Sequence, residues 1–142
     1  MNSFDRDGIS FNYPENWTTD SDDSENGGWT FSAMSPETAF VLVSLRPDVR
    51  DPADLADQTL DALRADYREL DAENRVETIA GRMAIGHEID FLTVDTAITC
   101  QTRCFDSAAG PVLVMCQSSE YDRETNGPVL QAIVASMKVE TD

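Results

Sequence analysis

The chain of 142 residues contains no long hydrophobic run, and this absence sets the first limits on its class. No stretch approaches the roughly 18 apolar residues that a membrane-spanning helix needs. Residues 1–7 also lack the basic and apolar regions of a secretory signal peptide. From the sequence as it stands, we expect a cytoplasmic protein.

Basic residues are scarce. Lys138 is the one lysine, and together lysine and arginine number 10 against 27 acidic residues, which gives a formal net charge of −17. A phosphate backbone or an anionic membrane would repel such a chain, and no basic stripe offsets the repulsion, so we expect neither partner. A basic protein partner is compatible with this charge. A dispersed acidic surface that only maintains solubility is the simpler explanation of the charge, and we favour it.

Several motifs of enzymes are also missing. The sequence has no G-x-S-x-G, no glycine-rich phosphate-binding loop and no C-x-x-C, and it has a single histidine. Hydrolase, nucleotide-binding and dithiol-redox interpretations therefore lack positive support. We identify no catalytic, cofactor-binding or metal-binding residue, and we expect a protein that is not an enzyme and needs no cofactor.

Three consecutive segments in the second half of the chain alternate with a period of two residues, as β-strands do. They cover residues 85–91, 97–105 and 111–118 and are joined by two short turns. All three are rich in β-branched and aromatic residues, so the pattern predicts a β-meander at the centre of a sheet.

The remaining strands are predicted from shorter patterns. They cover residues 8–13, 29–34, 38–46 and 76–79. The run Ala39–Val43 has no polar side, which predicts a central strand that is covered on both faces. Residues 18–28 contain many acidic residues and a Gly-Gly pair, and this composition predicts a loop.

Two amphipathic helices can cover such a sheet. The first is predicted over residues 52–70, because Asp51 is a good N-cap, Pro52 suits the first helical position, and apolar residues then recur at helical spacing. The second begins between residues 125 and 128 and ends near Met137. The pattern as a whole predicts one α+β domain, residues 1–142: an α/β/α sandwich with a mainly antiparallel sheet of about six to seven strands and helices on both faces.

Two motifs and the closing helix carry a resemblance to a known family. They are the segment Tyr13-Pro14-Glu15-Asn16-Trp17, the turn at Gly81 and the helix over residues 129–137. In this order of elements the chain is similar to the Mog/PsbP-like superfamily. The resemblance implies an α/β/α sandwich and a binding or scaffold protein rather than an enzyme with a shared active site. It does not imply a particular partner, because one fold serves many functions.

The three cysteines and the one histidine could form a metal site or a disulfide. We expect Cys100, Cys104, Cys116 and His87 to share one face of the sheet. Residues four apart on a strand are separated by about 13 Å, so Cys100 and Cys104 cannot bind one zinc ion. Cys100 is predicted to lie across from Cys116, which leaves a disulfide and a pair of reduced, buried thiols as alternatives.

Acidic residues form two further candidate sites. The spacing of residues 20–27 fails the EF-hand pattern, because Glu25 stands where that loop needs glycine. Glu88 and Asp90 share one strand face, and Arg103 is predicted to face them from the next strand; an ion pair explains these residues more simply than acid–base catalysis does.

Two functions remain open. The first is a non-catalytic accessory or protein-interaction domain, with an exposed apolar patch around Trp17 or Trp29 as its expected sign. The second is a small-ligand or ion-binding domain with a pocket between the sheet and the helix 52–70. A deep pocket with Glu88, Asp90 and Arg103 converging on it would favour this second function or an enzymatic one, which is the third and least favoured hypothesis.

Overall fold

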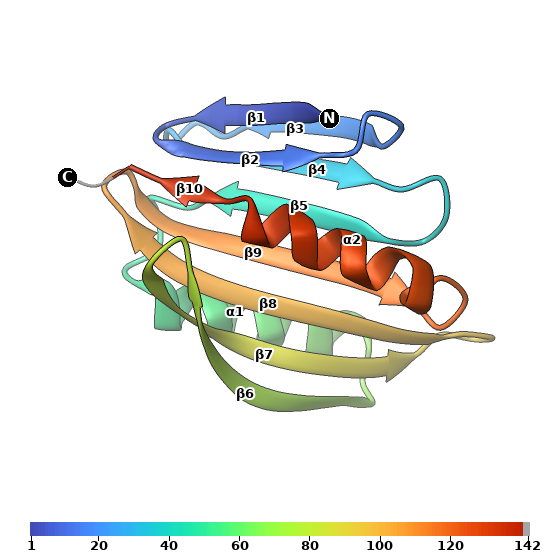
Figure 1. Ribbon diagram of the computed structural model, residues 1–142. Coiled ribbons are helices and arrows are strands. Elements are labelled where there is room, and N and C mark those ends of the chain that lie inside the picture. The colour runs from blue at the N-terminus through green and yellow to red at the C-terminus, as the bar shows by residue number, and fades with distance from the viewer. Residues whose placement is uncertain (141–142) are drawn as a thin grey trace.

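A seven-stranded antiparallel sheet forms the centre of the computed structural model, which describes residues 1–140 (Figure 1). The strand order is β3-β4-β5-β9-β8-β7-β6. The strands are β3 (Thr18–Asp23), β4 (Trp29–Met34), β5 (Phe40–Leu45), β6 (Leu70–Ile79), β7 (Arg82–Leu92), β8 (Ala97–Ser107) and β9 (Gly110–Ser119). The predicted meander is confirmed as β7-β8-β9.

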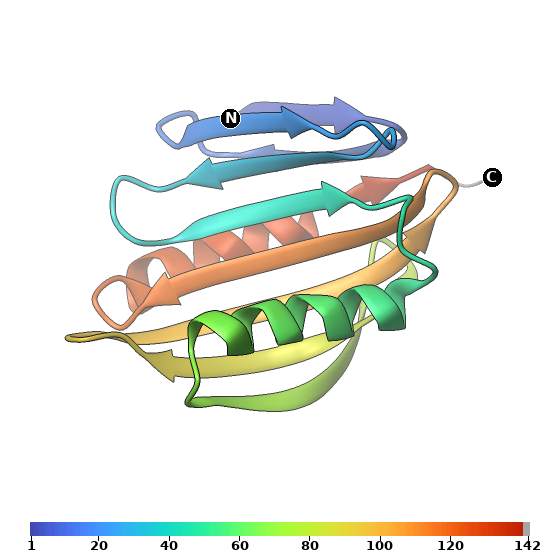
Figure 2. The same cartoon turned by 180° about the vertical axis from the view of Figure 1, so that it is seen from behind.

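One helix covers each face of this sheet, as predicted (Figures 1 and 2). Helix α1 (Pro52–Asp66) packs against β7, β8 and β9, whereas α2 (Arg123–Ala135) packs against β9 on the opposite face. Asp51 caps α1 by accepting a hydrogen bond from the backbone N–H of Asp54 at 2.8 Å. The α/β/α arrangement is therefore confirmed. Neither helix is long and apolar enough to cross a membrane, within the residues described.

A separate three-stranded sheet was not predicted. It consists of β1 (Asn2–Arg6), β2 (Ile9–Tyr13) and β10 (Lys138–Val139), with β2 in the middle. This sheet packs beside α2, and the ring of Phe4 lies 4.5 Å from that of Phe31 on β4. Residues 8–13 are thus a strand, as expected, but they belong to this small sheet rather than to the large one.

Three boundaries predicted from sequence are wrong. The strand predicted over residues 76–79 is β6, which already begins at Leu70; residues 73–78 are exposed, so the pattern gave no apolar alternation to mark it. Residues 18–23 form edge strand β3 rather than part of a loop; all six are exposed, so no apolar alternation marks the strand, and pairing with β4 holds it in place. Helix α1 ends at Asp66 instead of Leu70. Tyr67 is already extended and stacks on Phe91 at 4.1 Å between ring centroids, which turns the chain into β6.

Gly86 on β7 allows β7 and β8 to approach closely. A Cβ atom there would lie 1.9 Å from the carbonyl oxygen of Thr102 and 2.6 Å from its carbon, both backbone atoms. We therefore expect Gly86→Ala to lower the free energy of unfolding by about 1–3 kcal/mol, measured by urea denaturation.

Gly127 in α2 is the matched control, because a Cβ atom there meets nothing within 4 Å. Gly127→Ala is expected to stabilise the protein by about 0.5–1 kcal/mol, since alanine loses less backbone entropy in a helix. Equal urea midpoints for the two variants would contradict the close approach at Gly86.

Candidate binding groove

The sheet face on the side of α2 is only partly covered. Helix α2 packs against β9 and β2, so strands β6, β7 and β8 have no helix above them on this side. The β6–β7 hairpin bends toward α2 and forms the opposite wall (Figure 1). Arg82 fixes this hairpin by donating hydrogen bonds to the carbonyl oxygens of Asp106 (3.0 Å) and Glu140 (2.9 Å).

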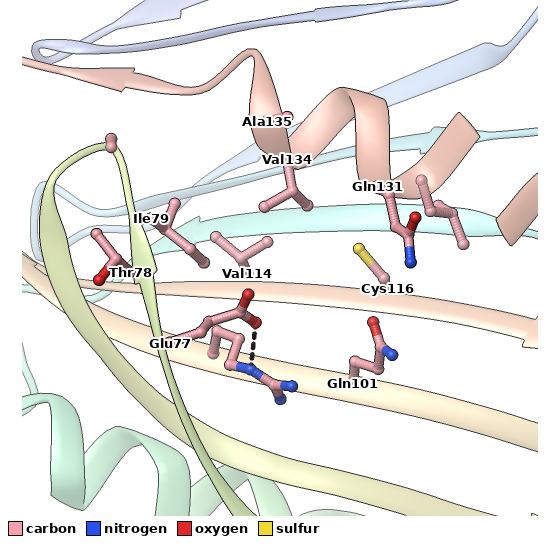
Figure 3. Close-up of a pocket in the computed structure, with 12 residues that line it drawn as sticks. Glu77, Thr78, Ile79, Gln101, Val114, Cys116, Gln131, Val134 and Ala135 are labelled. Atoms are coloured by element: carbon pink, nitrogen blue, oxygen red, sulfur yellow. Dashed lines mark ion pairs between the residues drawn. The ribbon is translucent and has the colours of Figure 1, made fainter. Parts of the chain in front are cut away.

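Two hollows lie between the hairpin and α2 and merge into one groove. The first has a volume of about 430 Å³ and the second about 440 Å³. They share Gln101, Cys116, Leu130 and Gln131 as lining residues. We call the two hollows together the α2 groove, and Figure 3 shows the first of them.

The walls of the α2 groove differ in character. Helix α2 contributes the apolar residues Leu130 and Val134, whereas β6 contributes the carboxylate of Glu77. Val114 and Cys116 of β9 lie on the floor. The groove therefore combines an apolar side with a charged side, as ligand-binding sites commonly do.

An ion cluster lies on the floor of the α2 groove. The Nε of Arg103 lies 2.5 Å from Oε1 of Glu77, an ion pair without hydrogen-bond alignment, and Nη2 donates to Oε2 of Glu88 at 3.4 Å. Nη1 donates to the carbonyl oxygens of His87 (3.1 Å) and Thr102 (2.8 Å). The Arg103 side chain is only 10% exposed, and its donors already face protein acceptors.

The cluster carries a net negative charge, because two carboxylates surround one guanidinium group. Glu77 is 49% exposed and Glu88 is 23% exposed, so Glu77 presents the more accessible charge. Oε1 of Glu88 also accepts a hydrogen bond from the Gln101 amide at 2.9 Å. Arg123 and Glu124 of α2 line the second hollow, so the groove as a whole contains three carboxylates and two guanidinium groups. Its net charge is negative, which favours a cation.

The residues predicted to converge do so only in part. Glu88 and Arg103 meet, as expected, although along a diagonal, because Arg103 pairs with Gly86 and Glu88 with Gln101. Asp90 is directed elsewhere and accepts a hydrogen bond from Thr99 at 3.0 Å. Glu77, the most exposed member of the cluster, was not predicted.

The pocket expected beside helix 52–70 is wrong in its location. Apolar side chains fill the space between α1 and the sheet, and the α2 groove lies on the opposite face. The buried residues there include Leu55, Ala56, Leu60, Ile89, Phe91, Cys100, Cys104 and Leu113. An apolar patch around Trp17 or Trp29 is also absent among the described residues, because both side chains are buried in the core.

The three cysteines do not share a face, and this corrects the expected site. Cys100 pairs with Gln117, and Cys116 pairs with Gln101, so Cys100 and Cys116 point to opposite sides of the sheet. All three are free buried thiols, and burial raises the pKa of each to about 12. The disulfide is excluded, and Cys116 in the groove is not a nucleophilic thiolate at neutral pH.

His87 lies on the sheet face that α1 covers, opposite the α2 groove. Its Nδ1 has no hydrogen-bond partner among the described residues, and burial lowers the pKa of its imidazole. Within residues 1–140, no three His, Cys, Asp or Glu side chains gather as metal ligands.

Comparisons with known proteins identify the fold. No family model matches the chain, and no curated protein matches it in sequence. The Pseudomonas aeruginosa protein PA94, of unknown function, superposes with a TM-score of 0.60 at 13% identity, over 100% of this chain and 99% of that one. Cyanobacterial PsbP (CyanoP) from Synechocystis superposes with a TM-score of 0.60 at 15% identity, over 98% and 92%.

A third structure extends the comparison to another bacterial group. LpqN of Mycobacterium tuberculosis, which is involved in cell envelope biogenesis, has a TM-score of 0.54 at 12% identity, over 94% of this chain and 83% of that one. Identities this low establish the fold and not the function. The chain therefore has a PsbP-like α+β fold.

Proposed function

We propose that this chain is a non-catalytic binding domain that docks a basic segment of another protein in the α2 groove. The observation that carries the proposal is the uncovered face of β6–β8, where a net negative ion cluster lies opposite an apolar helix wall. The structural neighbours described above are not named as enzymes. We also propose that the chain is a divergent member of the wider Mog/PsbP-like superfamily.

The chemistry of the α2 groove supports binding rather than catalysis. The buried Cys116 thiol has a pKa of about 12, and the one histidine of the chain lies on the opposite face of the sheet. Arg103 is held by hydrogen bonds to three protein acceptors and by an ion pair with Glu77, so it is not available to stabilise a developing negative charge. The groove thus lacks an activated nucleophile paired with a base.

The shape of the groove favours a segment of a protein. Its two hollows follow β8 from Arg103 to Thr99 and remain open to solvent along α2. Four residue steps on a strand cover about 13 Å, which suits several residues of an extended or helical segment. The charge of the whole chain, −17, would also speed the approach of a basic partner.

A small cationic ligand is the second candidate. The first hollow, at about 430 Å³, lies within the range of roughly 300–1,000 Å³ typical of small-molecule pockets. A probe as small as hexylamine distinguishes the two candidates, because it fits within one hollow and cannot span both.

The proposal is tested with defined probes and fluorescence anisotropy or calorimetry. An eight-residue peptide that alternates lysine and leucine is expected to bind, and its affinity is expected to fall with added salt. The peptide that alternates glutamate and leucine is expected not to bind. Binding of hexylamine as tightly as the lysine peptide would favour the small-ligand function instead.

Two variants with the same change of net charge locate the site. Glu77→Gln is expected to weaken binding of the lysine peptide by about fivefold, the effect of one ion pair worth roughly 1 kcal/mol. Asp22→Asn on β3, at the other edge of the sheet, is expected to change it less than about twofold. Equal losses for both variants would show that only the overall charge matters and would overturn the proposal.

A further inference from the structure

We propose that the α2 groove selects one lysine side chain of its partner, with the ammonium group against Oε2 of Glu77. This inference rests on the proposed function and specifies what the groove recognises. Three features of the first hollow carry it: the unpaired oxygen of Glu77, the apolar wall that lies near it, and the amide groups that line the same hollow.

The available oxygen belongs to Glu77. Its Oε1 faces Arg103, whereas the second oxygen points into the groove toward Val114 and Val134 (Figure 3). Both oxygens of Glu88 are already engaged, one by Gln101 and one by Arg103. Among the described residues of the cluster, Oε2 of Glu77 is therefore the one carboxylate oxygen without a protein partner.

A single unpaired carboxylate oxygen, Oε2 of Glu77, favours lysine over arginine. A guanidinium group binds a carboxylate best through two parallel hydrogen bonds, which need both carboxylate oxygens. Neither Glu77 nor Glu88 has two free oxygens. A lysine ammonium is a compact charge that pairs well with one oxygen.

The apolar wall fits the stem of a lysine side chain. Ile79, Leu130 and Val134 line the same hollow as Glu77. Lysine commonly lays its four methylene groups along apolar surface while its charged end stays polar. A short polar cation such as ammonium itself would leave this wall in contact with water.

Two glutamine side chains add neutral polar groups to the same hollow. The Gln101 amide nitrogen donates to Glu88, so its oxygen is free to accept a hydrogen bond. Gln131 of α2 lines the same hollow (Figure 3). The first hollow therefore offers neutral acceptors in addition to the carboxylate of Glu77, and these add no further charge to the groove.

The test uses four pentapeptides, Gly-Leu-X-Leu-Gly with blocked ends, where X is lysine, arginine, Nε-acetyl-lysine or norleucine. Their dissociation constants are measured by NMR titration of the protein. We expect the lysine peptide to bind about threefold or more tightly than the arginine peptide, and about fivefold or more tightly than the acetyl-lysine peptide, whose stem is intact but uncharged.

Variants show whether Glu77 makes the selection. Glu77→Gln is expected to remove the difference between lysine and acetyl-lysine, whereas Glu73→Gln, on the same strand and face but paired with Arg75, is expected to preserve it. Urea midpoints confirm that both variants fold. Lysine and acetyl-lysine peptides that bind equally to the unchanged protein would overturn the inference.

The two proposals fail in different ways. If the eight-residue lysine peptide binds at the groove but the pentapeptides do not distinguish lysine from arginine and acetyl-lysine, the selection of one lysine is wrong and the proposed function stands. If neither the longer peptide nor any pentapeptide binds at low salt, both proposals are overturned.

Discussion

Asp122→Ala is expected to lower the free energy of unfolding by about 3–5 kcal/mol. Asp122 is 2% exposed, and its Oδ2 accepts the backbone N–H groups of Thr38 (3.2 Å) and Ala39 (3.1 Å) and the amide of Asn126 (2.7 Å). Its Oδ1 accepts the Thr38 hydroxyl. Alanine leaves several of these donors without an acceptor, at roughly 1–3 kcal/mol for each buried group.

The position of Asp122 explains why one carboxylate has so large an effect. It stands directly before α2 and binds the chain as it enters β5, so it joins the helix beside the α2 groove to the centre of the sheet. Urea denaturation at pH 7 measures the loss. Glu124→Ala, an exposed acidic residue in the first turn of the same helix, is the control and is expected to cost under about 1 kcal/mol.

The same carboxylate makes the stability depend on pH. Burial alone would raise the pKa of Asp122, but hydrogen bonds from Thr38, Asn126 and Ala39 outweigh burial and lower the pKa below its ordinary value. The stabilisation is therefore complete above the pKa of the unfolded chain, about 3.9, and is lost as the pH falls through the lower folded value. The difference in the free energy of unfolding between wild type and Asp122→Ala is therefore expected to be smaller at low pH than at pH 7. An equal difference at the two pH values would contradict this link between the protonation of Asp122 and stability.

Trp17→Ala is expected to lower the free energy of unfolding by about 3–5 kcal/mol, because removal of a large buried side chain leaves a cavity that the core cannot fill. Trp17 is 6% exposed and belongs to the core between the two sheets. Its backbone N–H donates to the carbonyl oxygen of Pro14 at 3.2 Å, which closes the turn after β2. The urea midpoint measures the loss.

Tyr121 supplies the control for the tryptophan. It is 71% exposed, so Tyr121→Ala is expected to change the stability by no more than about 0.5 kcal/mol. An unchanged midpoint for Trp17→Ala would show that the turn from Tyr13 to Trp17 does not anchor the core, and would remove one basis for the resemblance that the sequence suggests.

Much of the large sheet was predictable because its strands are buried and alternate in polarity. Strands β7, β8 and β9 show the period of two, and the helix cap at Asp51 follows from local chemistry. Strand β3 could not be recognised in this way. Both of its faces are exposed, and an acidic strand without an apolar side resembles a loop in composition.

The predicted register between β8 and β9 is wrong by one residue, because Cys100 pairs with Gln117 and not with Cys116. This error placed Cys116 on the wrong face of the sheet. The β8–β9 turn contains only Ala108 and Ala109, because Ser107 pairs with Gly110. A slip of one residue exchanges the two faces of a strand. The length of the turn therefore decided whether a disulfide was conceivable, and sequence alone did not give that length.

The α2 groove was beyond a pattern-based prediction because it depends on tertiary placement. Glu77, Gln101 and Gln131 come from three elements, and they meet only because α2 covers β9 while the β6–β7 hairpin bends over the open strands. Glu88 and Arg103 were predictable as neighbours, because a cross-strand pairing places them together.

Chemical-shift mapping of the bound lysine–leucine octapeptide tests the central claim most directly. On a ¹⁵N-labelled sample, we expect the largest changes at the backbone amides of residues 77–80, 101–103 and 130–135, and at the side-chain amides of Gln101 and Gln131. Residues 18–23, an acidic strand at the far edge of the sheet, are expected to change little. Changes centred on residues 18–23, or spread evenly over the acidic surface, would contradict the assignment of the α2 groove as the binding site.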